Sequence, residues 1–105
     1  MKTLMNTKEL VSRYMAGQRD FRNMNLMAAD LKNINLSGVN FSGANLTKAN
    51  LTRTNLNRAN LTDAILTGAD LTGTNLASAN LTNANLSGVN LDHANLNGAI
   101  FKKAE

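Results

Sequence analysis

A five-residue hydrophobic repeat runs without interruption from Phe21 to Phe101, and it limits the possible folds more than any other feature. Every fifth residue in this span is Leu or Phe, a place that we call position i. Position i−2 is mostly a small residue, usually Ala, and position i−1 is almost always Asn or Asp. A disordered low-complexity segment has no reason to hold Leu at a fixed spacing, so the repeat predicts an ordered structure.

The odd spacing of the repeat excludes both common regular structures. In an α-helix a five-residue spacing would spread the Leu side chains around the axis, and in a long strand it would place them on alternate faces. A three-residue strand followed by a two-residue turn remains. In Ala44-Asn45-Leu46, for example, the two apolar residues flank an outward Asn and therefore point to the same side.

The glycines support this interpretation. Six of the seven glycines stand at position i+2, which is the third residue of the predicted turn. A type II turn needs a positive φ at its third residue, and Gly or Asn adopts this conformation most readily. We therefore expect a turn at each corner, with sides of five residues.

The spacing of the bulky residues indicates how many sides close one coil. A triangular coil would need fifteen residues and a square coil twenty. Phe21, Phe41 and Phe101 differ by multiples of twenty, and Thr54 and Thr74 at position i−2 differ by twenty. The stacking of alike residues favours the square.

Three segments, residues 44–48, 59–63 and 79–83, match the pattern A-(D/N)-L-x-x as they stand. The chain thus resembles the pentapeptide-repeat family over about four-fifths of its length, and its first residues resemble those of small cyanobacterial members. The resemblance implies a mainly β fold, a right-handed quadrilateral β-helix of about four coils. Departures from the pattern are Arg19 at position i−2, and Ile65 and Ile100 at position i−1.

The first residues predict a short capping α-helix. Asn6 is a good N-cap with Glu9 as its third helical residue, and Met5 and Leu10 are spaced as a hydrophobic staple. We expect the helix from about Thr7 to Ala16, lying across the first coil as terminal caps do in repeat proteins. The predicted organisation is a capping helix and lead-in at residues 1–20 and a β-helix at residues 21–105, within one domain.

Composition excludes several classes of function. The chain has no Cys, so disulfides and thiolate metal sites are excluded, and no cofactor is expected. No apolar run is long enough to span a membrane and no signal-peptide pattern is visible, so we expect a cytoplasmic protein. The net charge of +4 and the low aromatic content make nucleic acid an unlikely partner. The acidic DNA mimicry known in this family requires an acidic exterior, which the chain lacks.

No set of residues predicts catalysis. His93 is the sole histidine, and with Asp92 it is interpreted as a solvated surface pair because no second His or Cys can join it. Asp20, Asp30 and Asp70 replace Asn at position i−1, which we interpret as an exchange of similar polar residues on an outer face. We therefore do not expect an enzyme.

Four consecutive turns carry charge at position i+2, namely Lys48, Arg53, Arg58 and Asp63. The three cationic residues are interpreted either as solvated charges or as a weak docking site for an acidic partner. Weak binding of nucleic acid or another polyanion through these residues is the alternative function.

Ile100 and Phe101 are the strongest candidates for an interaction site. The repeats end with them, and the sequence printed after them, up to Glu105, contains no amphipathic segment that could cap the last coil. An uncapped coil exposes free backbone groups and an apolar cross-section. We therefore predict a structural or protein-interaction module that binds a protein partner, or a second copy of itself, through this end.

Overall fold

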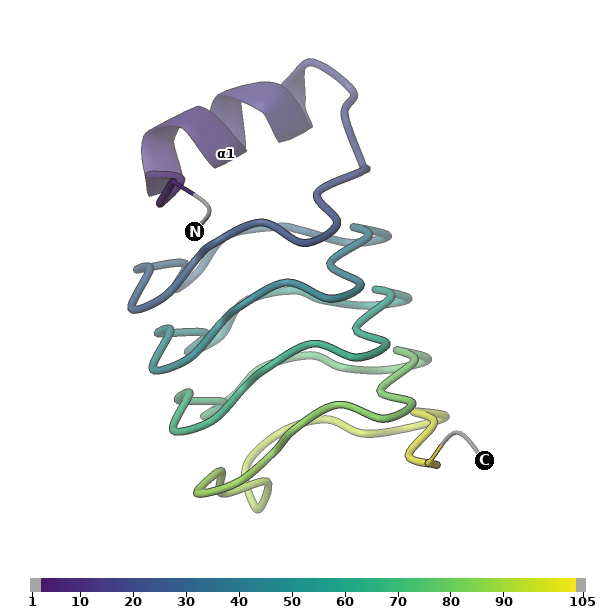
Figure 1. Ribbon diagram of the computed structural model, residues 1–105. Helices are drawn as coiled ribbons and strands as arrows, with labels where there is room; N and C mark the ends of the chain where they lie inside the picture. The colour runs from purple at the N-terminus through teal and green to yellow at the C-terminus, as the bar shows by residue number, and fades with distance from the viewer. Residues whose placement is uncertain (1–2, 104–105) are drawn as a thin grey trace.

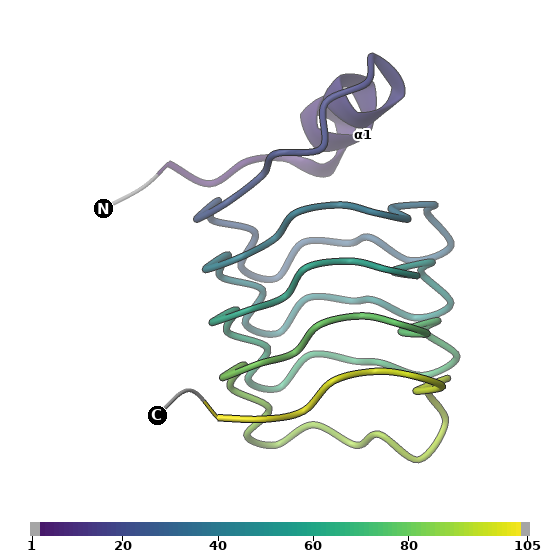
Figure 2. The same ribbon diagram turned by 90° about the vertical axis from the view of Figure 1, so that its right-hand side faces the viewer.

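The computed structural model describes residues 3–103, in which one helix, α1 (Thr7–Met15), lies across the end of a stack of coils (Figures 1 and 2). The coils descend from the α1 end toward the C-terminus, so the two ends of the described chain lie at opposite ends of the stack. Within the described residues, α1 is too short and too polar to cross a membrane.

Parallel bridges between successive coils establish the four-sided architecture. One column of bridges joins Asp20 to Asn40 and continues at steps of twenty residues through Asn60 and Asn80 to Ile100. Twenty residues therefore complete each coil, and the column spans four of these steps. The fold is the predicted right-handed quadrilateral β-helix. The predicted three-residue strands appear as isolated bridges at position i−1, because a turn follows too soon for a longer ladder.

The corners are β-turns with a positive φ at position i+2. Gly38 has φ 71° and Arg58 has φ 61°, so glycine and non-glycine residues take the same conformation. Within each turn, the residue at the next i−2 position donates its N–H to the carbonyl of position i, as Ala44 does to Phe41 at 2.9 Å. These observations confirm the turn predicted from the glycines.

The interior is filled by position i of every side. Leu26, Leu46 and Leu66 are completely buried, and the rings of Phe21 and Phe41 meet edge to face with centroids 6.2 Å apart. Thr54 and Thr74 are also completely buried, and their hydroxyls donate to the carbonyls of Leu31 and Leu51 at 2.7 and 2.6 Å. The buried polar groups are thus satisfied, as a packed interior requires.

The side chain at position i−1 has a structural role that the sequence interpretation missed. The Oδ1 of Asn45 accepts the backbone N–H of Thr47 at 3.1 Å, and the same Asx turn recurs along the rod. Asp20, Asp30 and Asp70 accept the equivalent N–H groups. Either Asn or Asp can therefore occupy position i−1. Ile65 and Ile100 lack an oxygen for this bond.

The N-terminal segment takes the place of a preceding coil. Asn6 caps α1 by accepting the N–H of Glu9 at 2.8 Å, and the helix ends at Met15, one residue before the predicted end. Leu4 forms a parallel bridge with Asn25, which the sequence did not predict. The Tyr14 hydroxyl donates to the carbonyl of Ser37 at 2.6 Å. The backbone of Leu4 and the buried side chains of Leu10 and Tyr14 thereby cover the first coil.

Arg19 stands at position i−2 but does not enter the interior. It is exposed, and its guanidinium lies over the ring of Tyr14, 3.7 Å from the centroid. It also donates to the carbonyls of Tyr14 and Gln18. Burying an unpaired charge would cost much more than this surface arrangement, which accounts for the departure from the repeat.

Candidate functional site

The last full turn of the β-helix, residues 84–103, exposes side chains that are buried everywhere else in the rod. Phe101 occupies position i and is 44% exposed, whereas Phe21 and Phe41 at the same position are 0% exposed. The other position-i residues of this turn are only partly buried, namely Leu86, Leu91 and Leu96. We call these four residues, with the backbone that carries them, the end face.

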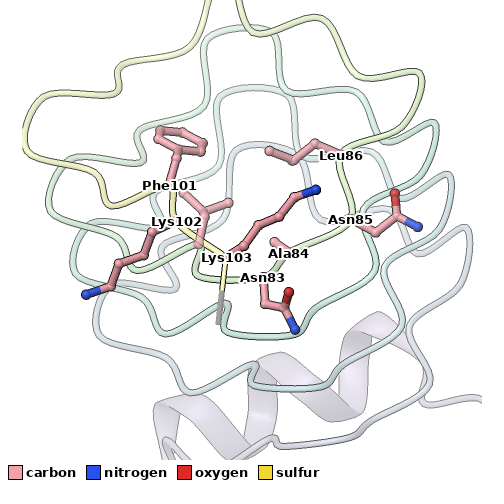
Figure 3. A pocket seen from close by; sticks show the side chains of 8 residues that line it. Asn83, Ala84, Asn85, Leu86, Phe101, Lys102 and Lys103 are labelled. Carbon is pink, nitrogen blue, oxygen red and sulfur yellow. The ribbon is translucent and has the colours of Figure 1, made fainter. Parts of the chain in front are cut away.

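A hollow of about 470 Å³ opens at one corner of the end face (Figure 3). It lies between residues 83–86 and residues 101–103, and Leu81 also lines it. The side chain of Lys103 is directed across the hollow toward Leu86, while Lys102 points away from it (Figure 3). The apolar stem of Lys103 thus covers part of the apolar surface while its amine stays in solvent.

Ile100 and Phe101 do not point in the same direction. Ile100 stands at position i−1 and is 42% exposed on the outside of the rod, while its backbone N–H donates to the carbonyl of Ala79 at 2.9 Å. Phe101 lines the hollow. The structure therefore places only Phe101 on the end face and leaves Ile100 at its rim.

The backbone edge of the last turn carries N–H groups that find no acceptor within the described part of the chain. In the coil above, the N–H groups of Leu76 and Ser78 donate to the carbonyls of Asn95 and Asn97, both at 2.8 Å. The equivalent N–H groups of Leu96 and Gly98 have no acceptor among residues 3–103. An edge of this kind can pair with another chain.

Sequence reasoning named Ile100 and Phe101 but missed Leu86, Lys102 and Lys103 as neighbours of Phe101. The twenty-residue period could have identified these neighbours. Residues 101–103 lie below residues 81–83 in the stack, which brings them beside residues 84–86 of the same coil.

The predicted cationic positions do not converge. Lys48, Arg53 and Arg58 are exposed at successive corners of one coil, each with a positive φ. The Nε of Arg53 donates to the Oδ1 of Asn33 at 2.8 Å, so part of its hydrogen-bonding capacity is used within the rod.

The corner at His93 departs from the regular repeat. The N–H of Gly73 donates to the carbonyl of His93 at 2.8 Å, one residue later than the pattern places the acceptor. His93 does not have the positive φ that the i+2 residues of the other corners have from Asn23 to Gly98, and the bridge between Asp70 and residue 90 is missing. Among the described residues, no group of three or more His, Cys, Asp or Glu side chains could hold a metal ion.

Two aspartates have a shifted pKa, and both shifts have structural causes. The Arg22 side chain, which donates to Asp20 at 2.9 Å, lowers the pKa of Asp20, and the pKa of Arg22 is raised in return. The backbone N–H and hydroxyl of Thr72 lower the pKa of Asp70. Both carboxylates are exposed and lie on the outside of the rod, where their bonds stabilise turns.

Solved structures similar to this chain are repeat proteins of the same type. The chain is 35% identical to HetL, a pentapeptide repeat protein involved in heterocyst differentiation regulation in the cyanobacterium Nostoc sp. strain PCC 7120, with a TM-score of 0.71. The match covers 90% of this chain and 48% of HetL, so the chain spans about half the length of HetL. A second Nostoc pentapeptide repeat protein, alr5209, is 34% identical, with 99% and 100% of the two chains covered and a TM-score of 0.53.

A pentapeptide repeat protein of the Arabidopsis thaliana thylakoid lumen is 30% identical, with a TM-score of 0.59 over 86% of this chain and 61% of that one. A search of curated proteins gives no match. The family model for pentapeptide repeats matches eight copies, at residues 20–43, 25–63 and 64–102. The twenty-residue coil, the Asx turns and these matches agree, and the chain belongs to the pentapeptide-repeat family.

Proposed function

We propose that this chain is a non-catalytic protein-interaction module and that its end face is the surface that binds another protein. The observation that carries the proposal is the exposure of Phe101 at a position where Phe21 and Phe41 are completely buried. Contiguous apolar surface of this kind is uncommon on a soluble protein unless it is an interaction site.

The sides of the rod offer less for a partner to recognise. They present mainly Asn and Thr. The side-chain oxygen of Asn80 accepts the backbone N–H of Thr82, and the Thr82 hydroxyl donates to the same oxygen, so these polar groups are used within their own turn. Lys48, Arg53 and Arg58 lie at separate corners, which disfavours the alternative of binding nucleic acid or another polyanion. The interior is closely packed with Leu and Ala, which supports a rod without a substrate site.

A role in regulation would be consistent with the similarity to HetL, a protein involved in the regulation of heterocyst differentiation. A rigid rod with an apolar interaction surface at the end face is suited to bind or block a partner protein without catalysing a reaction. The cytoplasm is the proposed compartment. Because one similar protein comes from the thylakoid lumen, cell fractionation is the measurement that distinguishes these two locations.

The proposal is tested by affinity capture from an extract of the source cells. The bait is the intact chain, and it is compared with two variants. The first is the double variant Ile100→Glu and Phe101→Glu. The second is the control Arg58→Glu, which changes the net charge by the same amount two coils away. We expect a protein retained by the intact chain and by the control to be lost from the double variant. Circular dichroism of all three baits verifies that they are folded.

Retention of every partner by the folded double variant would contradict the proposal. Loss of partners with Arg58→Glu alone would instead assign binding to the cationic corners. A gel shift titrated with salt tests the nucleic-acid alternative, since phosphate contacts weaken steeply as salt increases.

A further inference from the structure

The geometry points to a carboxylate-binding site at one corner in the middle of the rod, formed by Thr67, Ile65 and Lys48. An oxygen of a bound aliphatic carboxylate completes this corner, as an Asn side chain does at other corners. The site lies between two coils that bond to it, since Lys48 donates to the carbonyl of Thr67 and Gly68 donates to that of Ser87. It is separate from the end face and does not depend on the function proposed there.

Thr67 carries two hydrogen-bond donors that are unused within the described part of the chain. At the equivalent corner of the preceding coil, the Oδ1 of Asn45 accepts the N–H of Thr47 at 3.1 Å and its hydroxyl at 2.6 Å. The same pair of bonds recurs at other corners with Thr or Ser at position i+1. Ile65 replaces the Asn here, so neither donor of Thr67 finds an acceptor among residues 3–103.

Solvent reaches this corner, so a ligand can reach it as well. Thr67 is partly buried, and Ile65 is 39% exposed. No buried side-chain oxygen or nitrogen of the described residues lacks a partner, which means that the unpaired hydroxyl of Thr67 is accessible. Gly68 follows Thr67 and adds no side chain to the corner. An oxygen from another molecule can therefore approach both donors.

Lys48 supplies a positive charge beside these donors. Its backbone N–H donates to the carbonyl of Thr67 at 2.9 Å, which stacks the two residues in successive coils. Its Cγ lies 3.5 Å from the place that a Cβ would take on Gly68, so its side chain starts against this same corner. No described residue forms an ion pair or hydrogen bond with the side chain of Lys48. Its amine is therefore available to a ligand.

These three groups together favour an aliphatic carboxylate. A carboxylate already performs this role at the next corner, where Asp70 accepts the N–H and the hydroxyl of Thr72 at 3.0 and 2.7 Å. A carboxylate has two oxygens, one for the donors of Thr67 and one for the amine of Lys48, and hydrogen bonds to an ionised group are stronger than neutral ones. Ile65 offers apolar contact to the carbon atoms beside the carboxylate.

Nuclear magnetic resonance of the ¹⁵N-labelled 105-residue chain tests the inference. The probes are butyrate and N-acetylleucine, added at constant ionic strength, with the uncharged N-acetylleucinamide as the control. We expect both acids to move the amide resonance of Thr67 downfield in a saturable manner, with dissociation constants in the millimolar range because the site is small and exposed. Butyrate represents a free aliphatic acid and N-acetylleucine the end of a protein chain, so the tighter probe identifies the closer source.

Ile65→Asn is the decisive variant, because it supplies the missing acceptor from within the chain. The shift of the Thr67 amide on addition of butyrate should disappear, while the melting temperature should not fall, which separates loss of binding from unfolding. Ile65→Ala is the matched control. It leaves both donors of Thr67 unused, so it should still bind butyrate, about threefold more weakly because the apolar contact is reduced.

Lys48→Gln tests the contribution of charge. It should raise the dissociation constant of butyrate about threefold, as expected for an exposed ion pair. Arg58→Gln removes the same charge from another corner and should leave the dissociation constant unchanged.

Four outcomes would overturn the inference. The first is a Thr67 amide that stays unmoved as butyrate rises through the millimolar range. The second is an Ile65→Asn variant that binds butyrate as the wild type does. The third is an equal effect of Lys48→Gln and Arg58→Gln. The fourth is inorganic phosphate that binds at Thr67 more tightly than either acid, which would assign the site to a different class of ligand.

Discussion

Asparagine at position i−1 stabilises each corner of the rod from outside the core. Its side-chain oxygen accepts the N–H of position i+1, as in the bond of 3.0 Å between Asn60 and Thr62. The residue at i+2 then takes a positive φ, which favours Gly or Asn and costs energy for residues such as Arg53. The repeat therefore reflects local backbone requirements on its outer face as well as burial on its inner face.

Replacing Ile65 by Asn tests this role of position i−1. Ile65 has no oxygen to accept the N–H of Thr67 and is 39% exposed on the outside of the rod. Asn should therefore add a hydrogen bond whose gain exceeds the loss of apolar contact. We expect the free energy of unfolding to rise by about 1 kcal/mol, measured by urea denaturation. Ile65→Ala is the control, which should show no gain because Ala also lacks the acceptor.

The lowered pKa of Asp70 predicts a pH dependence of stability. Its folded pKa lies below the ordinary value of 3.8, so its stabilising effect is complete above that value and is lost as pH falls through the lower folded pKa. Asp70→Asn keeps the acceptor for Thr72 at every pH. As the pH is lowered from 5 to 2, the melting temperature of the wild type should therefore fall more than that of Asp70→Asn. A constant difference across this range would contradict the assignment.

The helix α1 works as a cap because its side chains bond to the first coil as well as cover it. Leu10 and Tyr14 are buried against the rod, and the Tyr14 hydroxyl meets the carbonyl of Ser37. Arg19 covers the outer face of the same ring. The sequence predicted a capping helix across the first coil, but these polar contacts depend on where the helix lies on the coil.

Tyr14→Phe separates the hydrogen bond of the cap from its apolar contact. The ring remains, but the partly buried carbonyl of Ser37 loses its donor. We expect the free energy of unfolding to fall by about 1 kcal/mol. Ser12→Ala, which removes an exposed hydroxyl from the same helix, serves as the control and should change stability by less than about 0.5 kcal/mol. Equal effects of the two substitutions would argue against the cap described above.

Within residues 3–103, Leu4 and α1 cover the first coil, whereas no described residue stacks below the last turn. Each coil contacts only its neighbours, so the stability of a position depends on whether a coil covers it on both sides. The interior of the middle coils is completely buried, as at Leu61, whereas Leu96 in the last turn is only partly buried. We expect local opening to begin at the end face and to spare the middle of the rod.

The same substitution at Leu61 and at Leu96 measures how the stability contribution of a position-i residue decreases from the middle of the rod to the last turn. Leu61→Asn would bury an amide without partners and remove a packed side chain, so we expect a loss of about 4 kcal/mol or more, enough to unfold much of the protein. Leu96→Asn should cost less than half as much, because solvent can reach the new amide. Thermal melting followed by circular dichroism gives both values. A wild-type-like melting temperature for Leu61→Asn would refute the register of the repeat.

Most of the fold could be predicted from the sequence because its repeat is local. Leu46 and Ala44 point inward because two residues flanking an outward Asn share one face, whatever the rest of the chain does. The candidate site was predicted less well. Phe101 and Ile100 were both named from the sequence, but only the structure separates them, with Phe101 on the end face and Ile100 at its rim. The irregular corner at His93 has no signal in the repeat.

The sequence by itself determined the five-residue sides, the square coil and the direction of every position-i side chain, since these follow from the geometry of a few consecutive residues. Only the tertiary structure decided which of those inward side chains are covered. Phe21, Phe41 and Phe101 are equivalent in the repeat, yet the first two are buried and the third is exposed. Burial depends on what stacks against a residue from the neighbouring coil, which is a property of the whole rod.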